Sequence, residues 1–164
     1  MSILYKWRNE PSFISMCTSR DQVYSIEAFD KELSFDFQND RHSQFIICFN
    51  QKPIGTIFTY SYNEIDKYIF VSVFIEGQYA NKSYGIKAFL ILCKQLFEQI
   101  KLYKVYIDIY EYNRKMLSIM TKCKFSIEGI FKNQHLYNNK RYDVRRYAVY
   151  EKDILFWFNK LLNV

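Results

Sequence analysis

The fold is decided by one stretch of sequence, YIFVSVFIEGQYANKSYGIKA, which covers residues Tyr68–Ala88. Its first eight residues, Tyr68–Ile75, are almost all apolar, a pattern typical of a strand buried on both faces. A short polar loop, Tyr79–Gly85, then leads into a segment whose apolar residues repeat with a helical period. This order directs free backbone N–H groups and the positive end of a helix at one point. The stretch therefore predicts an anion-binding loop, to which Lys82 and Lys87 would add charge; an ordinary strand-to-helix turn is the alternative.

The spacing of apolar residues predicts the elements on both sides of this stretch. The expected strands are 45–49, 54–62, 68–75, 104–110, 127–131 and 142–150. The expected helices are 2–15 (interrupted near Pro11), 21–37, 83–100, 113–123 and 153–162. Helices and strands that alternate in this way predict an α/β domain with a mixed sheet covered by helices.

Composition places the 164 residues in one globular domain, because 49% are hydrophobic and 20% aromatic. The four cysteines lack the close spacing of a zinc or redox motif and only two histidines are present, so no metal site is expected. The cysteines are typical of reduced, buried thiols. No apolar run reaches the ~18 residues needed to cross a bilayer. These features together predict a cytoplasmic protein.

Charge is distributed unevenly along the chain, whose net charge is +6. Residues 1–82 carry 8 basic and 10 acidic side chains, whereas residues 83–164 carry 15 and 7. The second half therefore favours anionic partners: nucleic acid, a membrane surface or a phosphorylated small molecule. Arginine-rich runs are absent, so nucleic acid is not expected as a partner.

A second segment, Glu111–Phe125, reads EYNRKMLSIMTKCKF and is followed by Glu128-Gly129. Together with the loop Tyr79–Gly85 (YANKSYG) and the later pair Tyr142-Asp143, it resembles the GNAT superfamily of N-acetyltransferases. The similarity is greatest to the branch that holds ribosomal-protein N-terminal acetyltransferases and related amino-sugar acetyltransferases. Its members show Tyr-Arg-Gly-Lys-Gly-x-Gly and, later, Asn-x-x-Ala-x-x-x-Tyr-x-Lys-x-Gly-Phe. The resemblance implies a GNAT-like mixed, mostly antiparallel sheet with a splayed parallel strand pair, flanked by helices.

The chain departs from this family pattern at four positions. Ala80 replaces the Arg or Gln that opens the loop, and Ser83 replaces the first loop glycine. Backbone N–H groups can still bind an anion there, since they do not depend on the side chain. Met120 stands where the family has the tyrosine that protonates the departing thiolate, and Lys124 replaces the glycine before the phenylalanine.

The resemblance implies acetyl-CoA as the co-substrate, lying where strands 68–75 and 104–110 splay apart. Its pantetheine arm would follow the backbone of the first strand, and its pyrophosphate would lie on the loop. The implied cofactor-binding residues are Val73, Phe74, Ile75, Asn81, Lys82, Ser83, Tyr84, Gly85, Asn113 and Lys115. Asn113 also fits a plain helix cap, and Arg114 and Lys115 also fit a solvated helix face.

Catalysis requires a group that removes a proton from the amine and one that protonates the sulfur. Glu76, at the end of the buried strand, is the candidate general base, with an exposed loop carboxylate as the alternative. Met120 cannot donate a proton, and the nearby residues that could are Tyr112, Ser118, Cys123 and His135. His135 precedes the predicted turn at 137–140 and fits a surface position on the hairpin better.

The acceptor is expected near the first helix, where Trp7, Arg8 and Asn9 resemble the opening of GNAT enzymes that act on nucleotide-linked amino sugars. Arg8 could pair with a phosphate or carboxylate; a core tryptophan beside a surface arginine is the alternative. The single domain, 1–164, is thus expected to hold acceptor-side helices (1–42), a sheet and CoA-binding core (43–150) and a C-terminal helix (151–164).

The sequence therefore predicts an acetyl-CoA-dependent N-acetyltransferase that acts on a primary amine of a small molecule such as an amino sugar. A protein N-terminus or a polyamine is the alternative acceptor, and a non-catalytic CoA-binding domain is the alternative function. The expected partner is the small amine, without nucleic acid or membrane, and the expected state is a monomer or homodimer.

Overall fold

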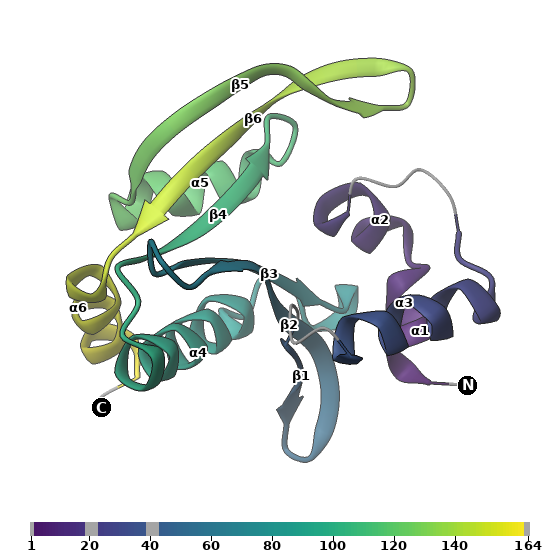
Figure 1. Cartoon of the computed structure of the whole chain (residues 1–164), viewed down its shortest axis with the longest axis horizontal. Coiled ribbons are helices and arrows are strands. Elements are labelled where there is room, and N and C mark those ends of the chain that lie inside the picture. Colours follow the sequence, from purple (N-terminus) through teal and green to yellow (C-terminus); the bar gives the residue numbers. More distant parts are fainter. Residues whose placement is uncertain (1, 19–22, 39–42, 163–164) are drawn as a thin grey trace.

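A computed structural model describes residues 2–18, 23–38 and 43–162 (Figure 1). Its helices are α1 (Ile3–Arg8), α2 (Pro11–Cys17), α3 (Ile26–Gln38), the single 3₁₀ turn η1 (Gly77–Tyr79), α4 (Tyr84–Ile100), α5 (Arg114–Cys123) and α6 (Glu151–Leu161). Its strands are β1 (Ser43–Phe49), β2 (Lys52–Asn63), β3 (Tyr68–Ile75), β4 (Lys104–Tyr110), β5 (Ser126–Tyr137) and β6 (Lys140–Val149). The interruption predicted near Pro11 is confirmed, because that proline starts α2.

The six strands form one sheet in the order β1-β2-β3-β4-β6-β5. Every neighbouring pair is antiparallel except β3 and β4. Those two strands pair in parallel over three positions only, Tyr68 with Lys104 through Phe70 with Tyr106. Beyond them β3 stays paired with β2 and β4 with β6, so the sheet splits (Figure 1). The predicted mixed, mostly antiparallel sheet with a splayed parallel pair is confirmed.

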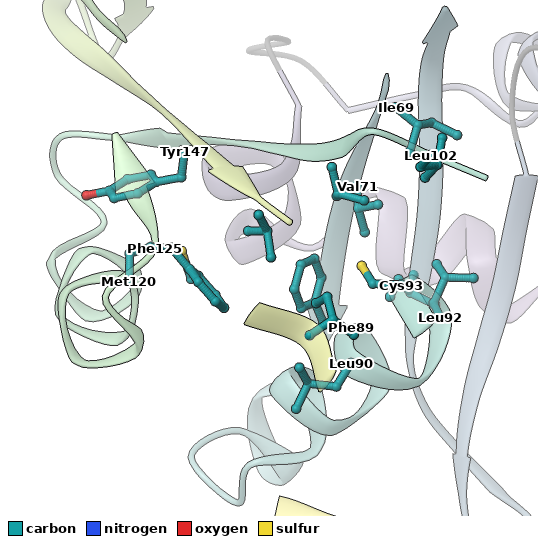
Figure 2. Packing of buried hydrophobic residues seen from close by; sticks show 14 of the residues in the cluster. Ile69, Val71, Phe89, Leu90, Leu92, Cys93, Leu102, Met120, Phe125 and Tyr147 are labelled. Carbon is teal, nitrogen blue, oxygen red and sulfur yellow. The ribbon is translucent and has the colours of Figure 1, made fainter. Parts of the chain in front are cut away.

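Helices cover both faces of the sheet. Helices α4, α5 and α6 enclose the larger core, in which Val71 of β3, Phe89 of α4 and Met120 of α5 are buried (Figure 2). On the opposite face, the α1–α2 unit packs through Trp7 and Phe13 onto β2 and β3. Because both faces of β3 are covered, its nearly continuous apolar sequence is explained. Among the described helices, none is long and apolar enough to cross a membrane.

Two hairpin turns consist of adjacent residues in the left-handed region. Asn50 and Gln51 join β1 to β2 with φ of 49° and 62°, and Asn138 and Asn139 join β5 to β6 with φ of 48° and 58°. Two positive φ values in a row match the twist of antiparallel strands, and asparagine tolerates them better than most residues. The predicted turn at residues 137–140 therefore lies where the sequence placed it.

The second predicted helix, 21–37, begins too early. Residues 21 and 22 lie outside the described residues, and Val23–Ser25 are not helical; α3 starts at Ile26. The Asn9 side chain accepts a hydrogen bond from the Tyr24 amide at 2.8 Å and donates to the Tyr24 carbonyl at 3.3 Å. Ser25 Oγ then accepts from the Ala28 amide, as an N-cap does. These side-chain bonds satisfy backbone groups that an earlier helix start would have used.

Strand β5 is longer than the predicted 127–131, since it continues to Tyr137 through two register shifts. The second shift lies between Phe131 and His135 and brings the histidine opposite Tyr142 of β6. His135 is 7% exposed, so the surface position that the sequence favoured is wrong.

Candidate active site

The split between β3 and β4 opens a cavity of about 1180 Å³ that extends between the two strands. Its walls come from α2, β2, β4 and β5 on one face of the sheet and from α4, α5 and α6 on the other. Exposed residues line it on both faces of the sheet: Ser12 and Met16 of α2 on one, Arg114 and Lys115 of α5 on the other. Since pockets for one small ligand usually measure about 300–1,000 Å³, the cavity has room for a long ligand and a second small molecule.

The loop before α4 forms one wall of the cavity and has the geometry of an anion site. Asn81 and Ser83 both have left-handed backbones, with φ of 66° and 62°. Left-handed residues at a helix start turn successive N–H groups toward one side, where the helix dipole also favours negative charge. A Cβ at Gly85 would lie 3.4 Å from an Ile75 side-chain atom and 3.6 Å from one of Val73, which is ordinary van der Waals contact, so α4 begins close against β3.

The start of α5 faces this loop across the cavity. Asn113 caps the helix by accepting from the Met116 amide at 3.2 Å, and it also lines the cavity. Lys115 Nζ donates to Asn81 Oδ1, which joins α5 to the loop and leaves a cation at the cavity wall. The predicted helix cap at Asn113 is confirmed.

On the opposite face, α2 is attached to both sides of the split. Cys17 Sγ donates to the Val73 carbonyl of β3 at 3.7 Å. Across the gap, Tyr110 Oη of β4 donates to the Thr18 carbonyl at 3.2 Å, and Tyr112 Oη donates to the Ser15 carbonyl. Burial raises the pKa of Cys17 to about 11 and that of Tyr110 to about 12, so both groups keep their protons at neutral pH.

His135 lies beside these tyrosines in the cavity wall. Its ring stacks on Tyr110 with 3.8 Å between centroids and 7° between planes. Its Nε2 lies 3.1 Å from Tyr112 Oη. Burial lowers the pKa of His135, because the apolar surroundings disfavour the imidazolium. A neutral imidazole and a phenol are thus in hydrogen-bonding contact at the cavity.

The acidic side chain that lines this face is already paired. Asp108 accepts two hydrogen bonds from Arg146, at 2.8 Å from Nε and 2.7 Å from Nη2. The guanidinium also lies over the Phe70 and Phe131 rings, 4.7 Å from each centroid. Among the described residues, hydroxyl groups and aromatic rings therefore dominate the wall on this side, and its one carboxylate is paired.

Comparison with models of known protein families agrees with this architecture. A family model for the acetyltransferase (GNAT) domain matches residues 2–126, which is most of the chain. The chain belongs to the GNAT acetyltransferase family. No curated protein sequence matches it.

Solved GNAT structures share the whole fold. The spermidine N-acetyltransferase from Vibrio cholerae, solved with CoA and spermine, superposes with a TM-score of 0.84 at 16% identity, over 93% of this chain and 90% of that one. A point mutant of the same Vibrio cholerae enzyme gives a TM-score of 0.79 at 18% identity, over 93% and 90% of the two chains. A putative acetyltransferase gives 0.74 at 13% identity, over 93% and 81%. At these identities the likeness establishes the fold alone.

GNAT enzymes take acetyl-CoA as co-substrate, and it supplies the acetyl thioester. The residues present fit such a donor: past Phe70 the β4-facing edge of β3 has no strand partner, and the loop and Lys115 favour anionic groups. All the predicted cofactor residues except Lys82 line the cavity: Val73, Phe74, Ile75, Asn81, Ser83, Tyr84, Gly85, Asn113 and Lys115. Lys82 is exposed on the loop, outside the lining. The individual contacts to CoA stay predictions.

Glu76 lies at the end of β3, as predicted, but it does not line the cavity. Its Oε1 accepts from Lys6 Nζ at 2.7 Å, and this hydrogen bond lowers the pKa of the carboxyl group. A carboxylate stabilised in its charged form is a weaker base. Its catalytic role stays a prediction.

The predicted acceptor residues hold α1 in place and lie outside the cavity wall. Trp7 is fully buried beside Phe74, with 6.2 Å between ring centroids. Arg8 is also buried and pairs with Glu32 at 3.1 Å, while the Asn9 side chain bonds to the backbone of Tyr24. Their role in acceptor binding stays a prediction.

Sequence reasoning missed several cavity residues on the acceptor face, among them Cys17, Tyr60, Asp108 and Tyr110. One signal was available: in strand 104–110 the polar residues alternate with apolar ones, which places Asp108 and Tyr110 on one face next to the split. Cys17 gave no such signal, since its place depends on how α2 packs.

Proposed function

We propose that this GNAT enzyme transfers the acetyl group of acetyl-CoA to a primary amine of a small molecule. The observation that carries the proposal is the cavity. An N–H-rich loop and the basic side chains of α5 line it on one face of the sheet, and hydroxyl and aromatic side chains line it on the other. A donor on the first face and an amine on the second would meet in the split. Holding two reactants in this way removes much of the entropic barrier to their reaction.

The acceptor face favours a compact, hydroxylated amine such as an amino sugar. Tyr60, Ser72, Tyr110 and Gln134 line it with groups that hydrogen-bond to hydroxyls, and tyrosine rings also attract an ammonium group. Asp108, the carboxylate in this wall, is neutralised by Arg146.

A polyamine is the second candidate, supported by the structural likeness to the Vibrio cholerae spermidine N-acetyltransferase solved with spermine. A chain of several ammonium groups needs several free carboxylates. Among the described residues that line the cavity, the one carboxylate is that of Asp108, and it accepts two hydrogen bonds from Arg146. We therefore expect the polyamine to be the weaker acceptor.

The test is release of CoA thiol from acetyl-CoA with a panel of amino sugars, nucleotide-linked amino sugars, spermidine, spermine and a peptide with a free N-terminus. Turnover with an amino sugar at a higher kcat/KM than with spermidine is the expected result, and the reverse order would select the polyamine. Thermal stabilisation by CoA is measured first, since a ligand that binds only the native state raises Tm. Absence of turnover with every amine would overturn the proposed function.

A further inference from the structure

The position at which the family protonates the leaving sulfur is occupied here by a group that cannot donate a proton. Met120 is 1% exposed and packs in the larger core with Leu117 and Phe125. A thioether has no exchangeable hydrogen, so the proton must come from solvent or from another residue.

Two of the residues near this position in sequence form a pair in the cavity wall. Tyr112 follows β4 and His135 lies in β5, and the 3.1 Å between Oη and Nε2 is a hydrogen-bond distance. Stacking on Tyr110 fixes the plane of the imidazole. The Tyr112 hydroxyl has two acceptors within reach, the Ser15 carbonyl and, in the tautomer with its hydrogen on Nδ1, His135 Nε2.

The surroundings of the pair keep both members neutral. Among the described residues, the groups that face His135 are phenols: Tyr110 from β4, Tyr112 from the turn after it, Tyr137 from β5 and Tyr142 from β6. From α2, the Ser15 carbonyl and the Cys17 thiol approach the same tyrosines. Burial raises the pKa of Tyr112 and lowers that of His135, so a proton acceptor and a proton donor are both available at neutral pH.

We propose that Tyr112 and His135 form the proton relay of the transfer reaction, a role that rests on the proposed amine acetylation. The Tyr112 hydroxyl takes one proton from the acceptor ammonium while it gives its own to His135 Nε2. The amine nitrogen then forms its bond to the acetyl carbon, and the carbon–sulfur bond breaks with its electron pair on sulfur. The same proton returns from Nε2 through Tyr112 to the sulfur, and the second ammonium proton leaves to solvent. The relay thus ends in its starting state.

The first test needs no substrate. The chain has two histidines, so comparison with His135→Gln assigns the His135 signals in long-range ¹H–¹⁵N spectra of the free protein. We expect Nε2 to be the unprotonated nitrogen at pH 7, a titration midpoint below 6.5, and a change in the Nε2 shift in Tyr112→Phe. Nε2 carrying the hydrogen throughout the neutral range, with no response to Tyr112→Phe, would overturn the relay.

The second test is kinetic. The acidic limb of the kcat/KM profile of the wild-type enzyme is expected at the midpoint that NMR gives for His135. Tyr112→Phe and His135→Gln are expected to lower kcat by about 10²–10⁴-fold, the usual contribution of acid–base catalysis, with KM for acetyl-CoA unchanged. Tyr137→Phe, which removes a hydroxyl from a ring near His135 but outside the cavity lining, is the matched control and should retain activity.

The outcomes separate the two proposals. Wild-type turnover combined with variants that stay within tenfold and keep the same pH limb would overturn the relay and leave the acetyltransferase activity intact. No wild-type turnover with any amine would overturn the function and the relay with it. Tyr112→Phe preserves the ring and its packing, so a lost rate in a variant with unchanged Tm and unchanged CoA binding supports the relay even where His135→Gln folds poorly.

Discussion

At the scale of single residues, Ser83 and Lys124 hold a backbone conformation that usually requires glycine. Both stand where the family has glycine, and both have positive φ, 62° and 57°. At Lys124, the C-cap of α5, the amide donates to the Thr121 carbonyl and the next amide to Met120. The chain thus holds two non-glycine residues in the left-handed region, at a cost of roughly 1–2 kcal/mol for each.

Lys124→Gly is therefore expected to stabilise the protein. The gain should be about 1 kcal/mol, because removal of the Cβ strain exceeds the extra chain entropy of glycine. For a domain of this size that corresponds to a rise in Tm of about 2–4 °C, measured by thermal unfolding. Lys122→Gly, earlier in the same helix and in the helical conformation, is the matched control and should lower stability by about 1 kcal/mol. Equal effects of the two changes would contradict the strain argument.

His135 should make stability depend on pH. Its pKa is below 6.5 in the folded protein and near 6.5 in the unfolded chain, so the unfolded state binds more protons in the window below 6.5. The stabilising contribution is complete above pH 6.5 and is lost as the pH falls toward the folded-state pKa. We expect Tm to decrease from pH 7.5 to pH 5 more steeply in the wild type than in His135→Gln. Parallel curves for the two proteins would show that this group is not responsible.

Glu76→Gln tests the base predicted from the sequence. The hydrogen bond from Lys6 lowers the pKa of this carboxyl group, so it is poorly suited to accept a proton. We expect kcat to fall less than tenfold, well short of the loss expected for His135→Gln. A drop of about 10²-fold or more, the range typical of a general base, would restore Glu76 to the mechanism.

At the scale of elements, the sequence predicts all six strands because their apolar residues and turn residues are local signals, although β5 continues past its predicted end. The buried run Tyr68–Ile75 predicted β3, and the turns that contain asparagine predicted the β1–β2 and β5–β6 hairpins. The start of α3 and the burial of His135 were wrong, since each depends on a contact distant in sequence, from Asn9 to Tyr24 and from Tyr110 to the imidazole. The cavity wall formed by β3 and the loop after it could be predicted because its residues are consecutive in the sequence and give a local signal. The opposite wall could not, because its residues are brought together by tertiary packing.

The pairing of β2 with β3 should depend on Gly55. A Cβ at this position would lie 2.2 Å from the Phe74 carbonyl oxygen, so Gly55→Ala must push the two strands apart. We expect a loss of roughly 1–3 kcal/mol in the free energy of unfolding, as for other overpacked sites. Urea denaturation measures it, and Gly77→Ala, whose Cβ would meet nothing within 4 Å, is the matched control. A loss at Gly77 as large as that at Gly55 would contradict this explanation.

At the scale of the whole molecule, the uneven charge of the chain has a structural counterpart. The cavity wall formed by α4 and α5 carries Arg114, Lys115 and Lys122, all from the basic half of the sequence. The opposite wall carries aromatic and hydroxyl groups and a neutralised Asp108. Charge therefore distinguishes a basic wall from an aromatic and hydroxyl wall on the two faces of one sheet.

The exposed residues that line the cavity on both faces of the sheet bear on the order in which substrates bind and products leave. If the donor and the amine enter from opposite faces, neither has to depart before the other arrives, and both occupy the protein together. The protonated Cys17 thiol is a poor nucleophile, so we expect no covalent acetyl-enzyme intermediate at this cysteine. Initial-velocity plots at varied concentrations of both substrates should therefore intersect, and a family of parallel lines would indicate a ping-pong scheme instead.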